Sequence, residues 1–277
     1  MQLSCLPVSF FADIISGEMS LAQWAQMGRE LGLDGIDVSI LFFPEASRTA
    51  IRQARHEVED AGMRVNMIST YPDFTHPDPL ERERELGRAQ ESVAVASWLG
   101  CNYVRLVAGQ AHPETTREQG IAWAIAGMSD LVETTQGADV ALVYENHGKP
   151  GAWTYTDFSQ PPDIFMEIAR AVTPLGVGIN FDTANATAFA PDPVALLDAV
   201  IDDVVTIHAA DTAVRGELEH CILGEGLVPF LPLFARLYES GWDGWMSIEE
   251  NARRGREGVE RSVRYVRQVW AEITKAP

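Results

Sequence analysis

Residues 140–147 read VALVYENH, an apolar run that ends abruptly in three polar side chains. The β-branched and aromatic residues of this run are typical of a buried strand. Glu145, Asn146 and His147 are not side chains that a core accepts without partners, because an ionised carboxylate loses much favourable hydration when it is buried. The run therefore predicts a strand whose carboxyl end meets a positive charge.

Runs of this kind recur along the whole chain. Eight stretches have the short, apolar, β-branched character of strands, at 3–10, 35–40, 64–70, 103–109, 140–147, 177–183, 204–211 and 244–251. Eight segments with helical apolar spacing alternate with them, at about 20–31, 46–61, 80–99, 114–136, 162–173, 192–201, 229–239 and 256–273. Ser20 and the Pro-Asp pairs at 162–163 and 191–192 supply helix start signals.

Strict alternation of strands and helices implies parallel strands joined by helical crossovers, and eight such units close a barrel. We therefore predict the α/β class and a single (β/α)8 TIM barrel domain over residues 1–277, with a metal site at the carboxyl ends of its strands. An open, doubly wound sheet is the alternative. It would normally carry a glycine fingerprint after its first strand, and SFFADIISGE has none.

The charge balance restricts the partners of the chain. Forty acidic residues against 21 basic ones give a net charge of −19, which disfavours nucleic acid and anionic membrane surfaces and favours a cation. No apolar stretch is long enough to span a membrane, and Asp13 interrupts the amino-terminal apolar segment. Cys5, Cys101 and Cys221 lack a paired spacing, so we expect reduced thiols in a cytoplasmic protein, for which a homo-oligomer is compatible with the sequence.

Four consecutive predicted strands end in side chains that bind metals. These are Glu145, Asp182 in NFDTAN, His208 in TIHAAD and Glu249 in SIEEN. One such carboxylate alone is commonly a helix N-cap or a solvated rim residue. If the four meet at the mouth of a barrel, their three carboxylates repel one another unless a divalent cation holds them. Oxygen ligands with one imidazole favour Mn2+, with Mg2+, Co2+ or Zn2+ as alternatives.

Further side chains are candidates for the same site. Strand alternation puts His147 on the face of Glu145, where it can act as a general acid/base or hold a substrate hydroxyl. Lys149 can contact a substrate carbonyl or anion, or be a solvated lysine, and Asp211 is expected to support the His208 imidazole. We interpret His112 as a surface loop residue, with a place at the rim of the pocket as the alternative, and His220 as a residue of the long loop after the seventh strand. Aromatic side chains that could wall a pocket or simply pack are Phe10, Phe11, Phe42, Phe43, Trp153, Tyr155 and Phe158.

The segments ENHG, FDTANA, IHAADT, LGEG and SIEEN together resemble the xylose isomerase-like TIM barrels. This group includes sugar isomerases, ketose 3-epimerases, hydroxypyruvate isomerases, inosose dehydratases and endonucleases of abasic-site repair. The resemblance runs from GLDGIDV to GWDGWMSIEEN. It implies that Glu145, Asp182, His208 and Glu249 hold one divalent metal, and that the two glutamates act as acid/base groups on opposite faces of a bound sugar.

The resemblance also implies a function. We expect a metal-dependent isomerase or epimerase that acts on a small sugar, keto-sugar or polyol through a metal-stabilised enediolate. One alternative is a lyase of the inosose or dehydroshikimate dehydratase type. The other is a non-catalytic carbohydrate-binding or partner subunit. An endonuclease fits poorly with six histidines and the charge of −19.

The contacts with substrate are expected to differ from those of the epimerases. Epimerases carry a histidine three residues after the sixth-strand aspartate, where this sequence has Asn185. Their arginine after the seventh-strand histidine has an approximate counterpart in Arg215. We therefore predict substrate contacts from Lys149, Asn185 and Arg215, and Arg105 could join Lys149 and Arg215 in holding a phosphate.

Overall fold

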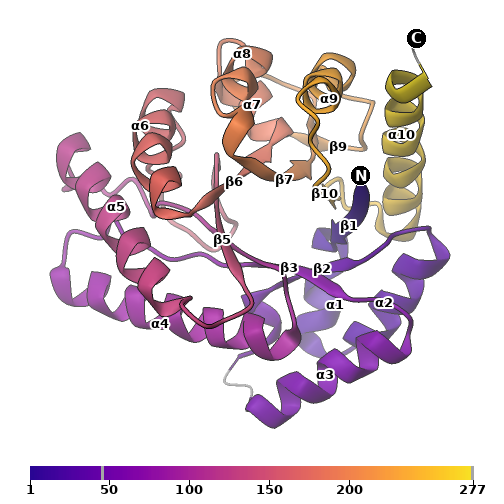
Figure 1. Ribbon diagram of the computed structural model, residues 1–277, viewed down its shortest axis with the longest axis horizontal. Coiled ribbons are helices and arrows are strands. Elements are labelled where there is room, and N and C mark those ends of the chain that lie inside the picture. Colours follow the sequence, from indigo (N-terminus) through magenta and orange to yellow (C-terminus); the bar gives the residue numbers. More distant parts are fainter. Residues whose placement is uncertain (45–46, 276–277) are drawn as a thin grey trace.

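The computed structural model describes residues 1–44 and 47–275, and the expected barrel is confirmed. Within these ranges eight parallel strands pair in the order β1-β10-β7-β6-β5-β4-β3-β2 (Figure 1). Their bounds are Gln2–Leu6 (β1), Ile36–Ser39 (β2), Val65–Ser69 (β3), Tyr103–Leu106 (β4), Ala141–Glu145 (β5), Gly178–Asp182 (β6), Val204–Ala209 (β7) and Trp245–Glu249 (β10). Seven of the predicted runs contain one of these strands, and the run 3–10 overlaps β1, which begins one residue earlier.

The seam between β1 and β2 nearly closes the barrel. The backbone N–H groups of Asp34 and Gly35, just before β2, donate to the carbonyl oxygen of Leu3 at 2.8 and 3.1 Å. The Asp34 carboxylate in turn accepts from the N–H of Leu3 at 2.9 Å. Deeper inside, the Ser4 hydroxyl donates to the buried Asp37 carboxylate at 3.0 Å. First and second strands are therefore held side by side, as a barrel requires.

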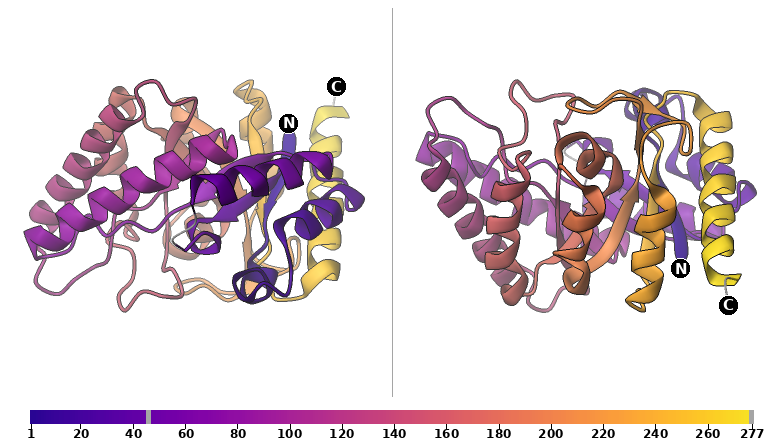
Figure 2. Two further views of the ribbon diagram at one scale, coloured as in Figure 1. Left: turned by 90° about the horizontal axis from the view of Figure 1, so that it is seen from below. Right: turned by 90° about the horizontal axis from the view of Figure 1, so that it is seen from above.

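Helices surround the strands, as Figures 1 and 2 show. The predicted helical segments overlap α2 (Leu21–Glu30), α3 (Arg48–Asp60), α4 (Pro79–Leu99), α5 (Arg117–Thr134), α6 (Pro162–Val172), α8 (Pro193–Asp198), α9 (Phe230–Glu239) and α10 (Gly255–Lys275). Of these, α4 and α10 extend one or two residues beyond the predicted bounds. The expected start of the second segment, at residue 46, lies outside the described residues. Ser20 caps α2, because its side chain accepts from the N–H of Gln23 at 3.2 Å.

Some predicted boundaries are wrong around the mouth of the barrel. The run 3–10 is too long, since β1 ends at Leu6 and Pro7 has no N–H with which to extend a strand ladder. Helical turns follow instead. Elements that the sequence did not predict are α1 (Phe11–Ser16), α7 (Thr183–Phe189), the 3-10 helices η1 (Val8–Phe10), η2 (Ile40–Phe42), η3 (Thr173–Leu175) and η4 (Ile201–Asp203), and a hairpin of β8 (Asp211–Thr212) and β9 (His220–Cys221).

Strand register brings the candidate residues to one end of the barrel. Asp182 on β6 pairs with His208 on β7, and His208 lies opposite Ser247 on β10, two residues before Glu249. In Figure 2 both chain ends lie together at the other end, where β1 begins and α10 stops. Within the described ranges, no helix has both the length and the hydropathy needed to cross a bilayer.

Candidate metal centre and its cavity

Four strand ends deliver Glu145, Asp182, His208 and Glu249 to one point. Each of these residues offers one ligand atom, and the four atoms lie within 4.8 Å of one another. The Nδ1 atom of His208 is 3.3 Å from a Glu145 oxygen and 3.2 Å from a Glu249 oxygen. Glu145, Asp182 and His208 are fully buried, whereas the Glu249 side chain is 19% exposed. The group can therefore hold a metal ion, and Glu249 is the member that faces solvent.

Asp182 also begins a helix. One of its carboxylate oxygens accepts from the backbone N–H of Asn185 at 2.6 Å and so caps α7. The neighbouring strand is fixed to it through Asn146, whose side-chain amide donates to the Asp182 carbonyl at 2.9 Å and accepts from its N–H at 2.8 Å. Asp182 can therefore cap α7 and bind a metal at the same time, because only one of its two carboxylate oxygens takes part in the cap.

A buried arginine supplies the positive charge that the end of VALVYENH required. The Nε atom of Arg105, on β4, lies 2.9 Å from the Glu145 carboxylate, and the Arg105 guanidinium lies over the ring of Tyr71 at 4.8 Å. Burial alone raises the pKa of Glu145, but Arg105 and His208 outweigh it and lower that pKa to about 2. The sequence signal for this partner was a single cation inside the apolar run YVRLVAG.

Arg105 does not balance the whole group. Burial and the charges of Glu145 and Glu249 raise the pKa of Asp182 well above its usual range. Burial disfavours a charge on His208, but the same two glutamates outweigh it and raise the pKa of the imidazole well above its ordinary value. Three carboxylates this close repel one another and favour protonation of the group. A divalent cation removes this repulsion, so the donor set fits a metal.

A cavity of about 1370 Å³ opens above this group at the carboxyl ends of the strands. Predicted site residues that line it are His147, Lys149, Asn185 and Glu249. The Asn185 Oδ1 atom has no hydrogen-bond partner in the part of the chain that the structure describes. Lys149 donates to the Thr154 carbonyl at 3.0 Å. Glu249 is thus the member of the metal group that lines the cavity, and Asn185 leaves hydrogen-bonding capacity unused on its wall.

His147 has a buried acidic neighbour. Its Nδ1 atom lies 3.7 Å from the carboxylate of Asp157, which is fully buried and accepts from the N–H and hydroxyl of Ser159 at 2.7 Å each. Burial raises the pKa of Asp157. Sequence reasoning missed this residue because twelve positions separate it from Glu145, and only the course of the β5 loop brings it back to His147.

Two further predictions have different outcomes. The Arg215 guanidinium donates to the carbonyl oxygens of Ala190 and Pro191 at 3.1 and 3.4 Å and is not among the residues lining the cavity. Its contact with substrate stays a prediction. His220, interpreted as a loop residue, lies on β9 and lines the cavity, and burial lowers its pKa. Its inward position depends on the β8–β9 hairpin, which the sequence did not indicate.

The expectation that Asp211 supports His208 is wrong. The His208 Nε2 atom has no hydrogen-bond partner among the described residues. The Asp211 carboxylate instead organises the loop after β7, because it accepts from four backbone N–H groups at 2.8 to 3.1 Å, those of Thr212, Gly224, Gly226 and Val228. The same loop carries β9, whose His220 pairs with Thr212 on β8.

Asp211→Ala should lower the free energy of unfolding by about 2–3 kcal/mol, because four backbone donors lose a charged acceptor and only some of them regain water. Urea denaturation followed by circular dichroism measures the change. Asp202→Ala, at an exposed position on η4, is the control and should change stability by less than about 0.5 kcal/mol. Equal stability of the two variants would show that the loop does not depend on this carboxylate.

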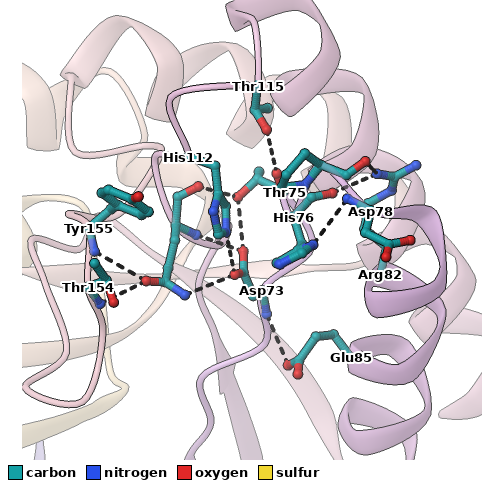
Figure 3. A network of polar contacts seen from close by, with 12 residues as sticks. Asp73, Thr75, His76, Asp78, Arg82, Glu85, His112, Thr115, Thr154 and Tyr155 are labelled. Atoms are coloured by element: carbon teal, nitrogen blue, oxygen red, sulfur yellow. Dashed lines mark hydrogen bonds and ion pairs between the residues drawn. The ribbon is translucent and has the colours of Figure 1, made fainter.

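A second polar network holds the rim (Figure 3). The Asp73 carboxylate, after β3, accepts from the Gln110 side chain at 3.0 Å and lies 2.8 Å from the His112 Nε2 atom. The carbonyl oxygen of the Gln110 side chain accepts from the N–H groups of Thr154 and Tyr155 at 2.9 and 3.2 Å. The loops after β3, β4 and β5 are thereby tied together. His112 is mostly buried in this network and is not a surface loop residue.

Comparison with known proteins supports the barrel. Residues 25–269 match the xylose isomerase-like TIM barrel family. The chain belongs to this family. An inosose dehydratase from Geobacillus kaustophilus is 24% identical over an alignment 292 residues long. The alignment covers 90% of this chain and 86% of that protein. The putative L-ribulose-5-phosphate 3-epimerase SgbU from Escherichia coli is 23% identical, with 97% of each chain covered.

Solved structures share the same architecture. The crystal structure of the IOLI protein with a bound zinc atom superimposes with a TM-score of 0.82 at 16% identity, and all of each chain is covered. The identity is low enough that the likeness concerns the fold alone. The named sequence relatives are an epimerase and a dehydratase, so they do not agree on one reaction.

Proposed function

We propose that this barrel is a divalent-metal-dependent isomerase or epimerase that acts on a sugar, keto-sugar or polyol by proton abstraction next to a carbonyl. The observation that carries the proposal is the position of four ligand atoms within 4.8 Å of one another, with one of the four residues, Glu249, lining the cavity. Proton abstraction next to a carbonyl needs a positioned base and a means of stabilising the enediolate. A carboxylate of the group can act as the base, and a cation held by the group would stabilise the enediolate.

Glu145, Asp182, His208 and Glu249 would hold the metal, for which we propose Mn2+ because three of the four ligands are carboxylates. The zinc atom of the IOLI protein makes Zn2+ the first alternative. When bound, such a cation supplies charge that stabilises an enediolate. Metal binding should also stabilise the fold by about 2.7 kcal/mol when its concentration is 100 times the dissociation constant.

The two glutamates are not equivalent, and this suggests separate roles. One oxygen of Glu145 is engaged by Arg105, and the residue is fully buried. Glu249 lines the cavity and is partly exposed. We therefore assign Glu249 as the base that first takes the proton, with Glu145 returning a proton from the other face in an epimerisation. The Arg105 charge keeps Glu145 ionised at the start of each cycle, so Glu145 must take up a proton from water in the cavity before it returns one to the substrate, and Glu249 then releases the substrate proton to water.

His147 is the third acid/base group in the proposal. Asp157 lies behind its Nδ1 atom at 3.7 Å, so the imidazole can present its other nitrogen to a substrate hydroxyl. Asn185 and Lys149 would contact substrate oxygens from the cavity wall. A contact from Arg215 would first require its guanidinium to release the Ala190 and Pro191 carbonyls.

A lyase is the second candidate, and the histidines of the cavity favour it. Dehydration begins with the same proton abstraction but then expels a β-hydroxyl, which needs a general acid. His147 and His220 both line the cavity and can supply this proton, in addition to the two glutamates. The similarity to an inosose dehydratase over 90% of the chain agrees with this alternative.

One experiment separates these reactions. Purified protein should contain about one divalent ion per chain by elemental analysis. The Mn2+-loaded protein should then incorporate deuterium from D2O into one carbon of a ketose or inosose, which nuclear magnetic resonance identifies together with the product. An epimer supports the leading proposal and an unsaturated product supports the lyase. Metal binding without exchange into any sugar or inosose would indicate a non-catalytic, carbohydrate-binding barrel.

A further inference from the structure

The cavity extends well beyond the metal group. Its volume of about 1370 Å³ exceeds the range of about 300–1,000 Å³ that is usual for small-molecule sites. The polar side chains at its inner end, among them Arg105, His147, Asn185 and Glu249, surround only one part of it. The rest of the cavity is a groove with a different lining, and one reacting sugar leaves this groove empty.

One face of α4 forms the outer wall of the groove. The lining residues Glu85, Arg88, Ala89, Ser92, Val95 and Trp98 recur at helical spacing along this face. At a rise of 1.5 Å per residue, the thirteen steps from Glu85 to Trp98 span about 20 Å. The opposite wall comes from the segments after β1 and β2, through Phe11, Leu41 and Phe43. The groove therefore runs continuously outward from the metal group.

The groove combines apolar surfaces with charged edges. Phe43 and Trp98 are half-buried, and the Trp98 ring is held by the guanidinium of Arg48, 5.6 Å from its centroid. Glu85 and Arg88 form an ion pair further along the same face of α4, toward its first residues. A sugar ring has an apolar C–H face that packs on aromatic side chains and hydroxyl groups that hydrogen-bond at the edges. A purely apolar substituent would satisfy the aromatic side chains but leave the charged edges desolvated.

We propose that this groove, which we call the outer subsite, binds a second sugar ring. The natural substrate is then a glycoside of disaccharide size, whose keto-sugar unit reacts at the metal while the second ring occupies the outer subsite. This inference rests on the proposed function and names its substrate class. Binding energy from the unreactive ring can hold the reacting carbon in place beside Glu249.

Isothermal titration calorimetry on the Mn2+-loaded protein tests the outer subsite. The probes are D-fructose and three keto disaccharides that differ in linkage, namely turanose, lactulose and isomaltulose. At least one disaccharide should bind about tenfold or more tightly than D-fructose, because the second ring buries additional apolar surface. Equal or weaker binding of all three disaccharides, or no binding by any probe, would overturn the proposal.

Variants locate the effect on the groove. Leu41→Ala and Trp98→Phe should each weaken the disaccharide several-fold and leave the affinity for D-fructose unchanged. Leu231→Ala is the matched control, because Leu231 is 49% exposed on α9 outside the cavity and Leu41 is 44% exposed within it. Disaccharide affinity that falls equally in Leu41→Ala and Leu231→Ala would contradict a role for the groove.

Two further measurements separate a sugar from an aryl ligand in the groove, and the outer subsite from the proposed reaction. Tighter binding of 4-nitrophenyl β-D-glucopyranoside than of every keto disaccharide would replace the second sugar by an aryl group and overturn the assignment made here. Deuterium exchange is read separately in the same protein. Disaccharide binding that depends on Leu41 but gives no exchange supports the outer subsite and refutes the proposed reaction. Deuterium exchange into D-fructose without any preference for a disaccharide supports the proposed reaction and refutes the outer subsite.

Discussion

Glu249→Gln should lower turnover by about 100- to 10,000-fold, the range that a lost general acid/base produces. Glutamine has nearly the same shape, and its amide oxygen can still approach a metal, but it cannot accept the substrate proton at neutral pH. Glu249 is the carboxylate of the metal group that reaches the cavity. The measurement is the rate of deuterium exchange per metal-loaded chain, with metal content determined on the same preparation.

The neighbouring residue provides the control. Glu250 points to the other side of β10, where its carboxylate contacts Ser9 and accepts from the N–H of Arg254 at 3.3 Å. Glu250→Gln should keep turnover within a few-fold of the parent chain, since it removes the same charge one position away. Glu145→Gln should lose turnover as well. Full exchange activity in Glu249→Gln with its metal retained would remove this residue from the proton transfer.

Arg105→Met should lower the free energy of unfolding of the metal-free protein by about 3–5 kcal/mol, because it leaves the buried Glu145 carboxylate without its cation. Both side chains of this pair are almost completely buried, so solvent does not screen the loss. Adding Mn2+ should restore part of the stability if the cation replaces the missing charge. Guanidinium denaturation, with and without EDTA, measures both quantities.

An exposed ion pair shows what burial contributes. Arg117 is 40% exposed and pairs with Asp163 and Glu167 on the surface. Arg117→Met should cost less than about 1 kcal/mol. The double variant Arg105→Met/Glu145→Gln should regain stability relative to Arg105→Met, since the buried residue at position 145 is then neutral. A loss for Arg105→Met as small as that for Arg117→Met would mean that Glu145 is neutral in the folded, metal-free protein.

Much of the barrel could be predicted because its signals are local. Apolar runs of β-branched residues, helical spacing and caps such as Ser20 depend on neighbours within a few positions. The predicted strand ends were less accurate, since residues after Leu6 turn into helix at the mouth of the barrel. The short helix α7 was also missed, because its sequence TANATAF carries little apolar periodicity and Asp182 supplies its cap.

The candidate ligands were predictable for the same reason that the fold was. Once four consecutive strands end in Glu145, Asp182, His208 and Glu249, the parallel order of the strands places those ends together. Asp211 shows the limit of this reasoning. It stands three residues from His208 along the chain, yet its carboxylate is turned toward four backbone N–H groups of its own loop, which only the folded loop brings within reach.

The sequence by itself determined the eightfold alternation and the three carboxylates and one imidazole at the ends of four of its strands, because period and residue type are properties of neighbouring positions. Tertiary structure alone decided that Arg105 reaches Glu145, that Asp157 lies behind His147 and that His220 turns into the cavity. These contacts depend on strand register and loop course, which set distances between positions far apart in the chain. The outer groove along α4 has the same origin, since its walls come from separate loops and a helix that meet only in the closed barrel.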